Sequence, residues 1–197
     1  NDSVGSFSNS GSIISKQDRG VDFDGLVGSF TNSGIIESER NGVSFGGGVS
    51  VGLNTGIIRS LAAAGEIGVR IDEPGSTFTN TGTIEGATAI AYILNGNGSS
   101  ILVNTGTLRG TDGSAIWFDG GDDLLRLETG SKIFGDVGFS GGNDTVDVSG
   151  FSGNTLLRVF DLENLVSGNK LAHLDSANDL LAVIEPAGIT QPAQLMS

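Results

Sequence analysis

The sequence predicts an all-β fold, a parallel β-helix of about eight stacked coils with a C-terminal cap. Three observations predict it: a polar triplet that returns every 22 to 26 residues, short stretches in which apolar and polar residues alternate, and 33 glycines among 197 residues. Alternation with a period of two is typical of β-strands. A repeat of this length without a helical period cannot bury its apolar side chains alone, so neighbouring copies must stack.

The triplet Asn-Ser/Thr-Gly marks one corner in each of the first five coils. An aliphatic residue follows two positions after each triplet glycine. We attribute Asn and Gly at this corner to their tolerance of left-handed backbone. Because stacking places like residues above like residues, we expect the triplet asparagines to form a hydrogen-bonded ladder along one edge. They are Asn9, Asn32, Asn54, Asn80 and Asn104.

Two further apolar positions complete each coil. Alternating pairs lie between the triplets: Val21/Phe23, Val43/Phe45, Val69/Ile71, Ile90/Tyr92 and Ile116/Phe118. Another apolar residue lies just before most triplets, as Phe7, Phe30, Phe78 and Leu102, with Leu53 shifted by one in the remaining copy. Each coil is therefore predicted to hold three short strands, paired in parallel with those of the next coil about 4.8 Å away.

After about residue 110 the repeat becomes shorter and more acidic. Residues 121–127 are echoed 21 positions later by residues 142–148, which extends the predicted coils to residue 153. From residue 154 glycine becomes rare and leucine common, so residues 154–197 are predicted to form a cap and the start of a linker. The N-terminal end has no comparable cap, and we expect the natural protein to continue upstream. Residues 61–65, in the longest coil, are predicted to protrude as a loop.

The order of Asn-Thr-Gly coils, Gly-Asn-Asp coils and a leucine-rich end resembles the passenger domain of a Gram-negative type V autotransporter, in its C-terminal part. Residues 80–84, 104–108, 142–148 and 154–184 carry the resemblance. It implies a right-handed β-helix, exported through the outer membrane and displayed at the cell surface or released. It also implies that the last coils and cap help folding proceed from the C-terminal end, as an autochaperone region, and that a C-terminal barrel absent from this chain provides the membrane anchor.

The charge of the chain excludes several classes of partner. Ten basic and 23 acidic residues give a net charge of −13, which repels nucleic acids and anionic lipid surfaces. The longest apolar run, Ala89–Leu94, is far shorter than the ~20 residues that cross a bilayer as a helix. Because the chain has no cysteine, neither disulfides nor thiolate metal sites contribute to its stability or chemistry.

The sequence offers no strong candidate for catalysis. Three Gly-x-Ser-x-Gly matches, centred on Ser44, Ser50 and Ser140, lack the helix that a nucleophile elbow requires. The single histidine, His173, lies in the predicted cap. We therefore interpret these serines as structural and expect no catalytic residue, no cofactor and no cofactor-binding or dedicated metal site.

Six aspartates of the later coils form a candidate acidic contact face: Asp119, Asp122, Asp123, Asp136, Asp144 and Asp147. Neighbouring coils can bring two carboxyls to the ~5–9.5 Å separation used in glycoside hydrolysis. Only Arg126 and Lys132 lie nearby to bind a polyanionic substrate, and Trp117, Phe118 and Tyr92 are the main candidates for stacking on a sugar. Adventitious Ca²⁺ on the carboxylates is a further alternative.

The leading functional hypothesis is therefore a surface-displayed adhesin. Many weak polar contacts along a repetitive surface would bind a host matrix protein, a host cell or the same protein on another cell. One alternative is a structural stalk that displays an upstream functional domain. The other is a polysaccharide-degrading enzyme built on the acidic coils.

Overall fold

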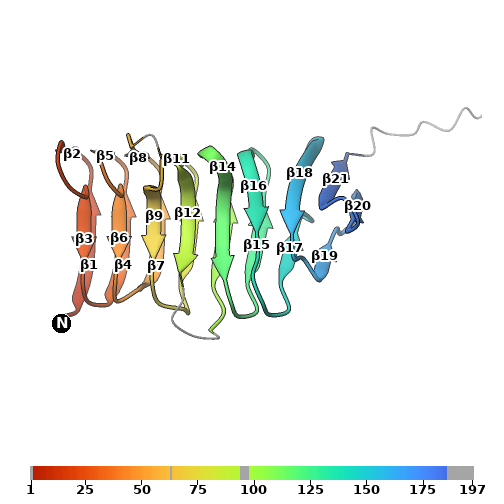
Figure 1. The fold of residues 1–197 in the computed structure, drawn as a ribbon, viewed down its shortest axis with the longest axis horizontal. Coiled ribbons are helices and arrows are strands. Elements are labelled where there is room, and N and C mark those ends of the chain that lie inside the picture. The colour runs from red at the N-terminus through yellow and green to blue at the C-terminus, as the bar shows by residue number, and fades with distance from the viewer. Residues whose placement is uncertain (1, 63, 94–97, 186–197) are drawn as a thin grey trace, which may run out of the picture.

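The structure, a computed structural model, describes residues 2–62, 64–93 and 98–185. Within these ranges every helix or strand that is assigned is a β-strand. The strands wind into about seven turns of a parallel β-solenoid, stacked along the long axis of the molecule in Figure 1. The predicted fold class is confirmed, and the number of coils is close to the expected eight.

One face of the solenoid, the first face, is an eight-stranded parallel sheet to which each successive coil adds one strand. Its register pairs identical triplet positions, for example Asn9 with Asn32 and Phe7 with Phe30. The triplet spacing in the sequence thus sets the register of the sheet. The strands are β1 (Val4–Asn9), β4 (Val27–Asn32), β7 (Val49–Asn54), β10 (Thr77–Asn80), β13 (Ile101–Asn104), β15 (Leu124–Leu127), β17 (Thr145–Asp147) and β19 (Asn164–Val166).

The other two faces of each coil belong to one sheet, because β14 (Thr107–Asp119) and β16 (Lys132–Gly138) run across the corner between them. The second face contains β2 (Ser12–Ser15), β5 (Ile35–Ser38), β8 (Ile57–Ser60), β11 (Thr83–Gly86) and the first parts of β14 and β16. The third face contains β3 (Val21–Phe23), β6 (Val43–Phe45), β9 (Ile67–Ile71), β12 (Thr88–Ile93), the last parts of β14 and β16, and β18 (Thr155–Phe160).

The core consists of apolar columns enclosed by the three faces. One column runs through Ile36, Ile58, Ile84 and Leu108, all fully buried. On the third face the aromatic rings of Tyr92, Phe118 and Phe139 stack with centroids 4.7 and 5.0 Å apart. Each fully buried side chain of this size stabilises the fold by roughly 1.5–3 kcal/mol, so the stacked columns provide the main stabilisation that a single coil lacks.

The third coil departs from the sequence prediction at one core position. Gly52, not Leu53, lies in register with Phe30 and Phe78. A Cβ on Gly52 would lie 2.2 Å from Cδ2 of Phe78, so the ring of Phe78 fills the space that a larger residue would need. The rings of Phe30 and Phe78 then stack across the glycine with centroids 6.4 Å apart. The core column is therefore continuous although one coil lacks an apolar side chain there.

The triplet glycines are required for a different reason from the one that the sequence suggested. Neither they nor the triplet asparagines have a positive φ. Instead, a Cβ on Gly56 would lie 2.1 Å from the carbonyl oxygen of Gly34 in the coil before it. A Cβ on Gly82 would lie equally close to the carbonyl oxygen of Gly56. Close approach of consecutive corners, and not left-handed backbone, explains glycine at this position.

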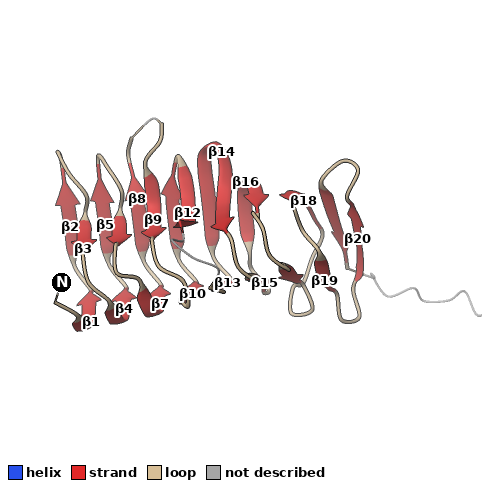
Figure 2. Ribbon diagram, turned by 60° about the horizontal axis from the view of Figure 1, so that its bottom comes forward, coloured by secondary structure: helices blue, strands red, loops and turns tan. Residues whose placement is uncertain are grey.

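The C-terminal end changes from parallel to antiparallel pairing over residues 155–184. β18 pairs in parallel with β16 and antiparallel with β21 (Leu180–Ile184), and β21 pairs with β20 (Leu171–Asp175). This hairpin closes the end of the rod in Figure 2. Because β19 still pairs in parallel with β17, coil-type pairing continues past residue 153. Residues 186–197, the last part of the predicted cap and linker region, lie outside the described residues.

Candidate functional site

The triplet asparagines form a continuous hydrogen-bonded ladder between the first and second faces. Each Nδ2 donates to the Oδ1 of the asparagine in the next coil at 2.8 Å, from Asn9 through Asn32, Asn54 and Asn80 to Asn104. The ladder ends there because Leu127 takes the next register position. All five side chains are buried, so the ladder joins coils to one another and presents no contact surface.

The six aspartates of the candidate acidic contact face do not share one exposed surface. Asp123, Asp144 and Asp147 are buried, with exposed fractions of 2%, 1% and 9%. Asp122 is exposed, and Asp119 and Asp136 are half-buried. The prediction is therefore corrected for the three buried carboxyls. They hold coils together and are not available to a partner or to a polysaccharide substrate.

Two of the buried aspartates belong to a carboxylate column, made of Asp123, Asp144 and Glu163. Each carboxyl accepts a backbone N–H from the coil before it: Asp123 Oδ1 from Ser100 at 2.7 Å, Asp144 Oδ1 from Asp123 at 2.7 Å, and Glu163 Oε2 from Asp144 at 2.8 Å. Each member comes directly before a strand of the first face. The column thus continues along the later coils the cross-coil bonding that the asparagine ladder provides earlier.

The carboxylate column is electrostatically strained. Burial raises the pKa of Asp123 to about 7, helped by the charges of Asp144 and Asp122, although the N–H of Ser100 favours the ionised form. Burial likewise raises the pKa of Asp144 to about 6, and the nearby charge of Glu163 adds to the effect. Within the described residues, Asp123 Oδ2 and the hydroxyls of Ser100 and Tyr92 are buried without a hydrogen-bond partner. With a pKa of about 7, the Asp123 carboxyl therefore changes between its neutral and ionised forms near physiological pH.

Asp147 behaves in the opposite way. Its burial opposes ionisation, but hydrogen bonds from the backbone and hydroxyl of Ser149 and from Arg126 lower its pKa. Arg126 lies in the adjacent coil, with Nε 3.1 Å from Asp147 Oδ2. The predicted neighbour of a polyanionic substrate, Arg126, is thus engaged in a cross-coil ion pair.

One exposed carboxyl, Asp122, lines a hollow that follows the ends of β14 and β16. The hollow has a volume of about 370 Å³ and is lined by Gly120, Gly121, Asp122, Ser140, Gly141 and Gly142. Asp119 directly precedes it in the sequence. Glycines supply four of its six lining residues, so the hollow is formed largely by backbone.

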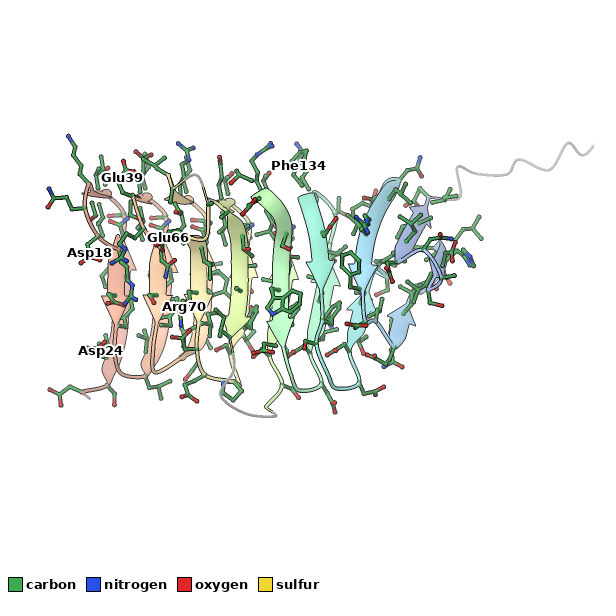
Figure 3. The ribbon with its side chains drawn as sticks, in the orientation of Figure 1. Asp18, Asp24, Glu39, Glu66, Arg70 and Phe134 are labelled. Atoms are coloured by element: carbon green, nitrogen blue, oxygen red, sulfur yellow. The ribbon has the colours of Figure 1, made fainter. Side chains whose placement is uncertain are left out.

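Charged residues on the second face form an alternating line that the sequence analysis missed. Arg59 lies 3.4 Å from Glu37 in the coil before and 3.6 Å from Glu85 in the coil after. Arg109 continues the line, and its guanidinium lies 4.2 Å from the ring centroid of Phe134. Figure 3 shows Phe134 pointing away from the rod. All of these residues except Phe134 follow a triplet asparagine by five positions, and this spacing was the signal that could have found them.

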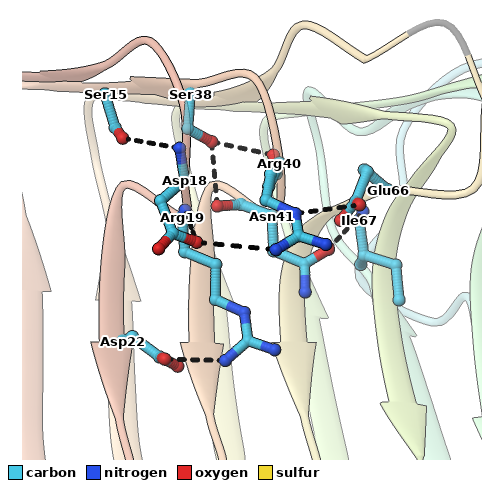
Figure 4. Close-up of polar contacts among 9 residues, drawn as sticks. All are labelled: Ser15, Asp18, Arg19, Asp22, Ser38, Arg40, Asn41, Glu66 and Ile67. Carbon is cyan, nitrogen blue, oxygen red and sulfur yellow. Dashed lines mark hydrogen bonds and ion pairs between the residues drawn. The ribbon is translucent and has the colours of Figure 1, made fainter.

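A similar line lies at the corner between the second and third faces of the early coils. Arg40 contacts Asp18 at 3.8 Å and Glu66 at 3.6 Å, in the coils before and after its own (Figure 4). Beside it, Asn41 Oδ1 accepts the N–H of Ile67 at 2.8 Å. Exposed ion pairs of this kind contribute only about 0–1 kcal/mol each. They favour correct alignment of the coils more than overall stability.

The three aromatic candidates for sugar stacking are separated by the fold. Tyr92 and Phe118 are fully buried in the core stack, whereas Trp117 is 39% exposed on the third face. Alternation along β14 places neighbouring residues on opposite sides of the sheet. Only Trp117 of the three is therefore available to a ligand.

The Gly-x-Ser-x-Gly serines and the histidine do not come together. Ser44 is buried in β6 of the second coil and Ser50 is exposed in β7 of the third. Ser140 lines the hollow after β16. His173 lies in β20 of the C-terminal hairpin, which is at the opposite end of the rod from β6 (Figure 1). Among the described residues, no contact joins His173 to any of these serines.

The loop predicted to protrude, residues 61–65, connects β8 to β9. Leu61 is 44% exposed, and Gly65 has a φ of +78° with no heavy atom within 4 Å of where a Cβ would lie. Ala63 lies outside the described residues. The described part of the loop carries no charged side chain, and it presents a small apolar surface to solvent.

Comparison with protein-family models, with curated proteins and with solved structures finds no match for this chain. Among residues 2–62, 64–93 and 98–185 there is no helix long and apolar enough to cross a membrane. In the same ranges, no three His, Cys, Asp or Glu side chains gather closely enough to hold a metal ion.

Proposed function

We propose that this chain is part of a cell-surface adhesin, the passenger of an autotransporter, which binds a host matrix protein, a host cell or a copy of itself on another cell. The proposal combines the resemblance of the coil sequences to such passengers with the kind of surface that the solenoid offers. Its rod of in-register coils presents long rows of outward-facing, half-buried to exposed side chains, which suit extended contact better than the conversion of a small substrate.

One observation carries the proposal: outward-facing residues of the first face align in unbroken rows. In one row, Ser8, Thr31, Leu53, Thr79, Val103 and Arg126 follow one another in register. Neighbours in a row are one coil apart, about 4.8 Å. A partner that contacts one coil therefore meets an outward-facing side chain at the same position of each next coil. Such repetition favours many weak contacts acting together, whose combined affinity exceeds that of any single one.

The test uses beads coated with the chain at graded densities. Adhesion to matrix proteins, to host cells or between beads should fall steeply as the coating is diluted, because multivalent binding depends on several contacts at once. Beads that carry the heat-denatured chain are the control. If the native coating binds none of these surfaces, the adhesin proposal is wrong for this chain, and the stalk function takes its place.

A further inference from the structure

We propose that Trp117 is the centre of a glycan-binding platform on the third face, formed by β14, β16 and β18. The inference rests on the proposed function and deepens it, because it names one site on the rod and the chemical class of its ligand. The ligand is an extended chain of uncharged sugar units. Four observations on the packing, layout, polar groups and charge of this face carry the inference.

The first observation is the packing of the Trp117 indole ring against the sheet. Gly138 of β16 pairs with Trp117 of β14, and a Cβ on Gly138 would lie 2.5 Å from Cε3 and 2.6 Å from Cζ3 of the ring. The six-membered part of the indole therefore lies directly over the glycine, against the backbone of the next coil. One side of the ring is held by the sheet while 39% of the side chain stays exposed. A fixed, solvent-facing aromatic surface is suited to stacking.

The second observation is the continuation of this surface into the next coil. Phe160 of β18 pairs with Gly138, so Trp117, Gly138 and Phe160 occupy one outward row over three coils. The ring of Phe160 is itself covered on one side by the guanidinium of Arg158, at 4.9 Å from its centroid. Two aromatic residues two coils apart, about 10 Å, match the length of a disaccharide in an extended chain.

The third observation is the position of polar groups on both sides of the row. Asp119 lies two residues after Trp117, and Asp136 lies two residues before Gly138, so both point outward with the row. Asp136 pairs with Arg158 at 3.7 Å. The hollow lined by Ser140 and Asp122 also includes Gly120, the residue directly after Asp119. Carboxylates beside an aromatic ring can accept the hydrogen bonds of sugar hydroxyls while the ring contacts the apolar face of the sugar.

The charge of the platform and the arrangement of its aromatic residues favour one class of ligand over others. Asp119, Asp122 and Asp136 outnumber Arg158, and the whole chain carries −13, so a polyanionic glycan is repelled. A cation-binding cage needs rings that face one another around the ion. Here the aromatic residues lie in one row along a sheet. An uncharged glycan laid across the coils fits this arrangement better than a basic peptide.

The chain itself supplies the reporter for the test, since Trp117 is its single tryptophan. We would titrate the full chain with cellohexaose, chitohexaose and maltohexaose, and in parallel with hyaluronan and with oligolysine, and follow tryptophan emission. At least one uncharged hexasaccharide should shift the emission saturably, and hyaluronan should not. If none of the uncharged hexasaccharides does so, or if only oligolysine does, the glycan proposal is overturned.

Variants then locate the binding. Trp117→Ala should weaken binding of that hexasaccharide, measured by calorimetry, by about tenfold or more. Gly138→Ala should also weaken it, because the new Cβ displaces the ring without removing it. Phe134→Ala is the matched control: Phe134 is similarly exposed, at 43%, but it lies on the second face and should leave binding unchanged. Equal binding by Trp117→Ala and the wild type would overturn the proposal, provided that their thermal midpoints agree within the error of measurement.

The same variant separates this proposal from the adhesin function. If beads coated with Trp117→Ala adhere as well as wild-type beads, the adhesin function stands and the platform is wrong. If wild-type beads do not adhere but the hexasaccharide still binds at Trp117, the platform stands and the adhesin function fails.

Discussion

Asn54 lies in the middle of the asparagine ladder and forms four hydrogen bonds within it. Its Nδ2 donates to Asn80 Oδ1 at 2.8 Å and to the carbonyls of Gly56 and Thr83 at 3.2 Å, while its Oδ1 accepts from Asn32. All of these groups are buried or partly buried. An unsatisfied buried polar group costs about 1–3 kcal/mol, so the effect of one asparagine extends to both neighbouring coils.

We therefore expect Asn54→Ala to lower the free energy of unfolding by about 2–5 kcal/mol, since it leaves several polar groups unpaired. Urea denaturation followed by circular dichroism measures the change. Asn9→Ala is the matched control, because Asn9 has a ladder partner on one side only. Asn9→Ala should lower the free energy of unfolding by clearly less than Asn54→Ala does. Equal decreases would show that the ladder does not act through both neighbours.

The buried carboxyls predict an unusual dependence of stability on pH. In the folded chain the pKa values of Asp123 and Asp144 are about 7 and about 6, whereas an unfolded Asp has a pKa of about 3.9. The folded state therefore binds protons more tightly between these values. The stability that protonation provides is fully present below about pH 4 and is lost as pH rises through 6 and 7.

Thermal unfolding should therefore give a higher midpoint at pH 5 than at pH 8, by roughly 2–6 °C for a chain of this size. Asp123→Asn keeps an oxygen for the N–H of Ser100 and should raise the midpoint at pH 8 and flatten its pH dependence. The control, Glu39→Gln, changes an exposed carboxyl of the second coil, far from the carboxylate column, and should leave the slope nearly intact. A midpoint that rises from pH 5 to pH 8 would contradict the assignment.

Among the elements of the fold, the corners between the first and second faces tolerate the least change. Gly34, Gly56, Gly82 and Gly106 each lie so close to the preceding corner that a Cβ would approach a carbonyl oxygen to 2.0–2.1 Å. Gly11 is the exception, because its nearest neighbour would be 4.0 Å away. The same turn therefore occurs both where the preceding corner lies close to the glycine and, at Gly11, where no preceding corner does.

This pair allows a direct test of why the corner requires glycine. Gly56→Ala should destabilise the chain by about 2 kcal/mol or more, as expected for overpacking against backbone, whereas Gly11→Ala should change stability by less than about 0.5 kcal/mol. Denaturant midpoints of the two variants and the wild type decide the matter. If both substitutions were equally harmful, backbone conformation and not close approach would explain the glycine.

For the whole molecule, the sequence predicted the features that repeat. It did not predict features that depend on how irregular coils pack against one another. The spacing of the triplets was sufficient for the fold and for the alignment of the ladder from Asn9 to Asn104. The burial of Asp123 and Asp144 was not predicted, because the Asp-Asp and Asn-Asp pairs at the start of these coils look equally solvent-exposed in the sequence. Their register positions match Ser76 and Ser100, which are also buried, and that alignment carries the missing signal.

The candidate site on the third face was only partly predictable for the same reason. Alternation indicated that some of the aromatic residues near residue 117 point inward, and Tyr92 and Phe118 do so. The seating of Trp117 on Gly138 depends on the pairing of β14 with β16 across an irregular corner. No periodic pattern in the sequence locates such a corner.

The C-terminal hairpin is expected to control the association state of the whole rod. Leu181 of β21 is fully buried, and Leu181→Ala should destabilise the chain by about 2–5 kcal/mol and loosen the strands that cover the last coil. Exposed strand edges favour pairing with other chains, so light scattering should detect larger species. Leu156→Ala, on an exposed residue of β18, is the control and should remain like the wild type in both measurements.

The direction of the hydrogen bonds between coils has a mechanical consequence. Because the strands run across the rod (Figure 1), the bonds that join neighbouring coils lie parallel to its length. A force that pulls on the two ends therefore loads these bonds one coil at a time, and not all together as in shear. Each coil of about 23 residues would release roughly 80 Å of chain as it detaches. Under tension the rod would lengthen stepwise and absorb work at each step, so it would act as an extensible spring.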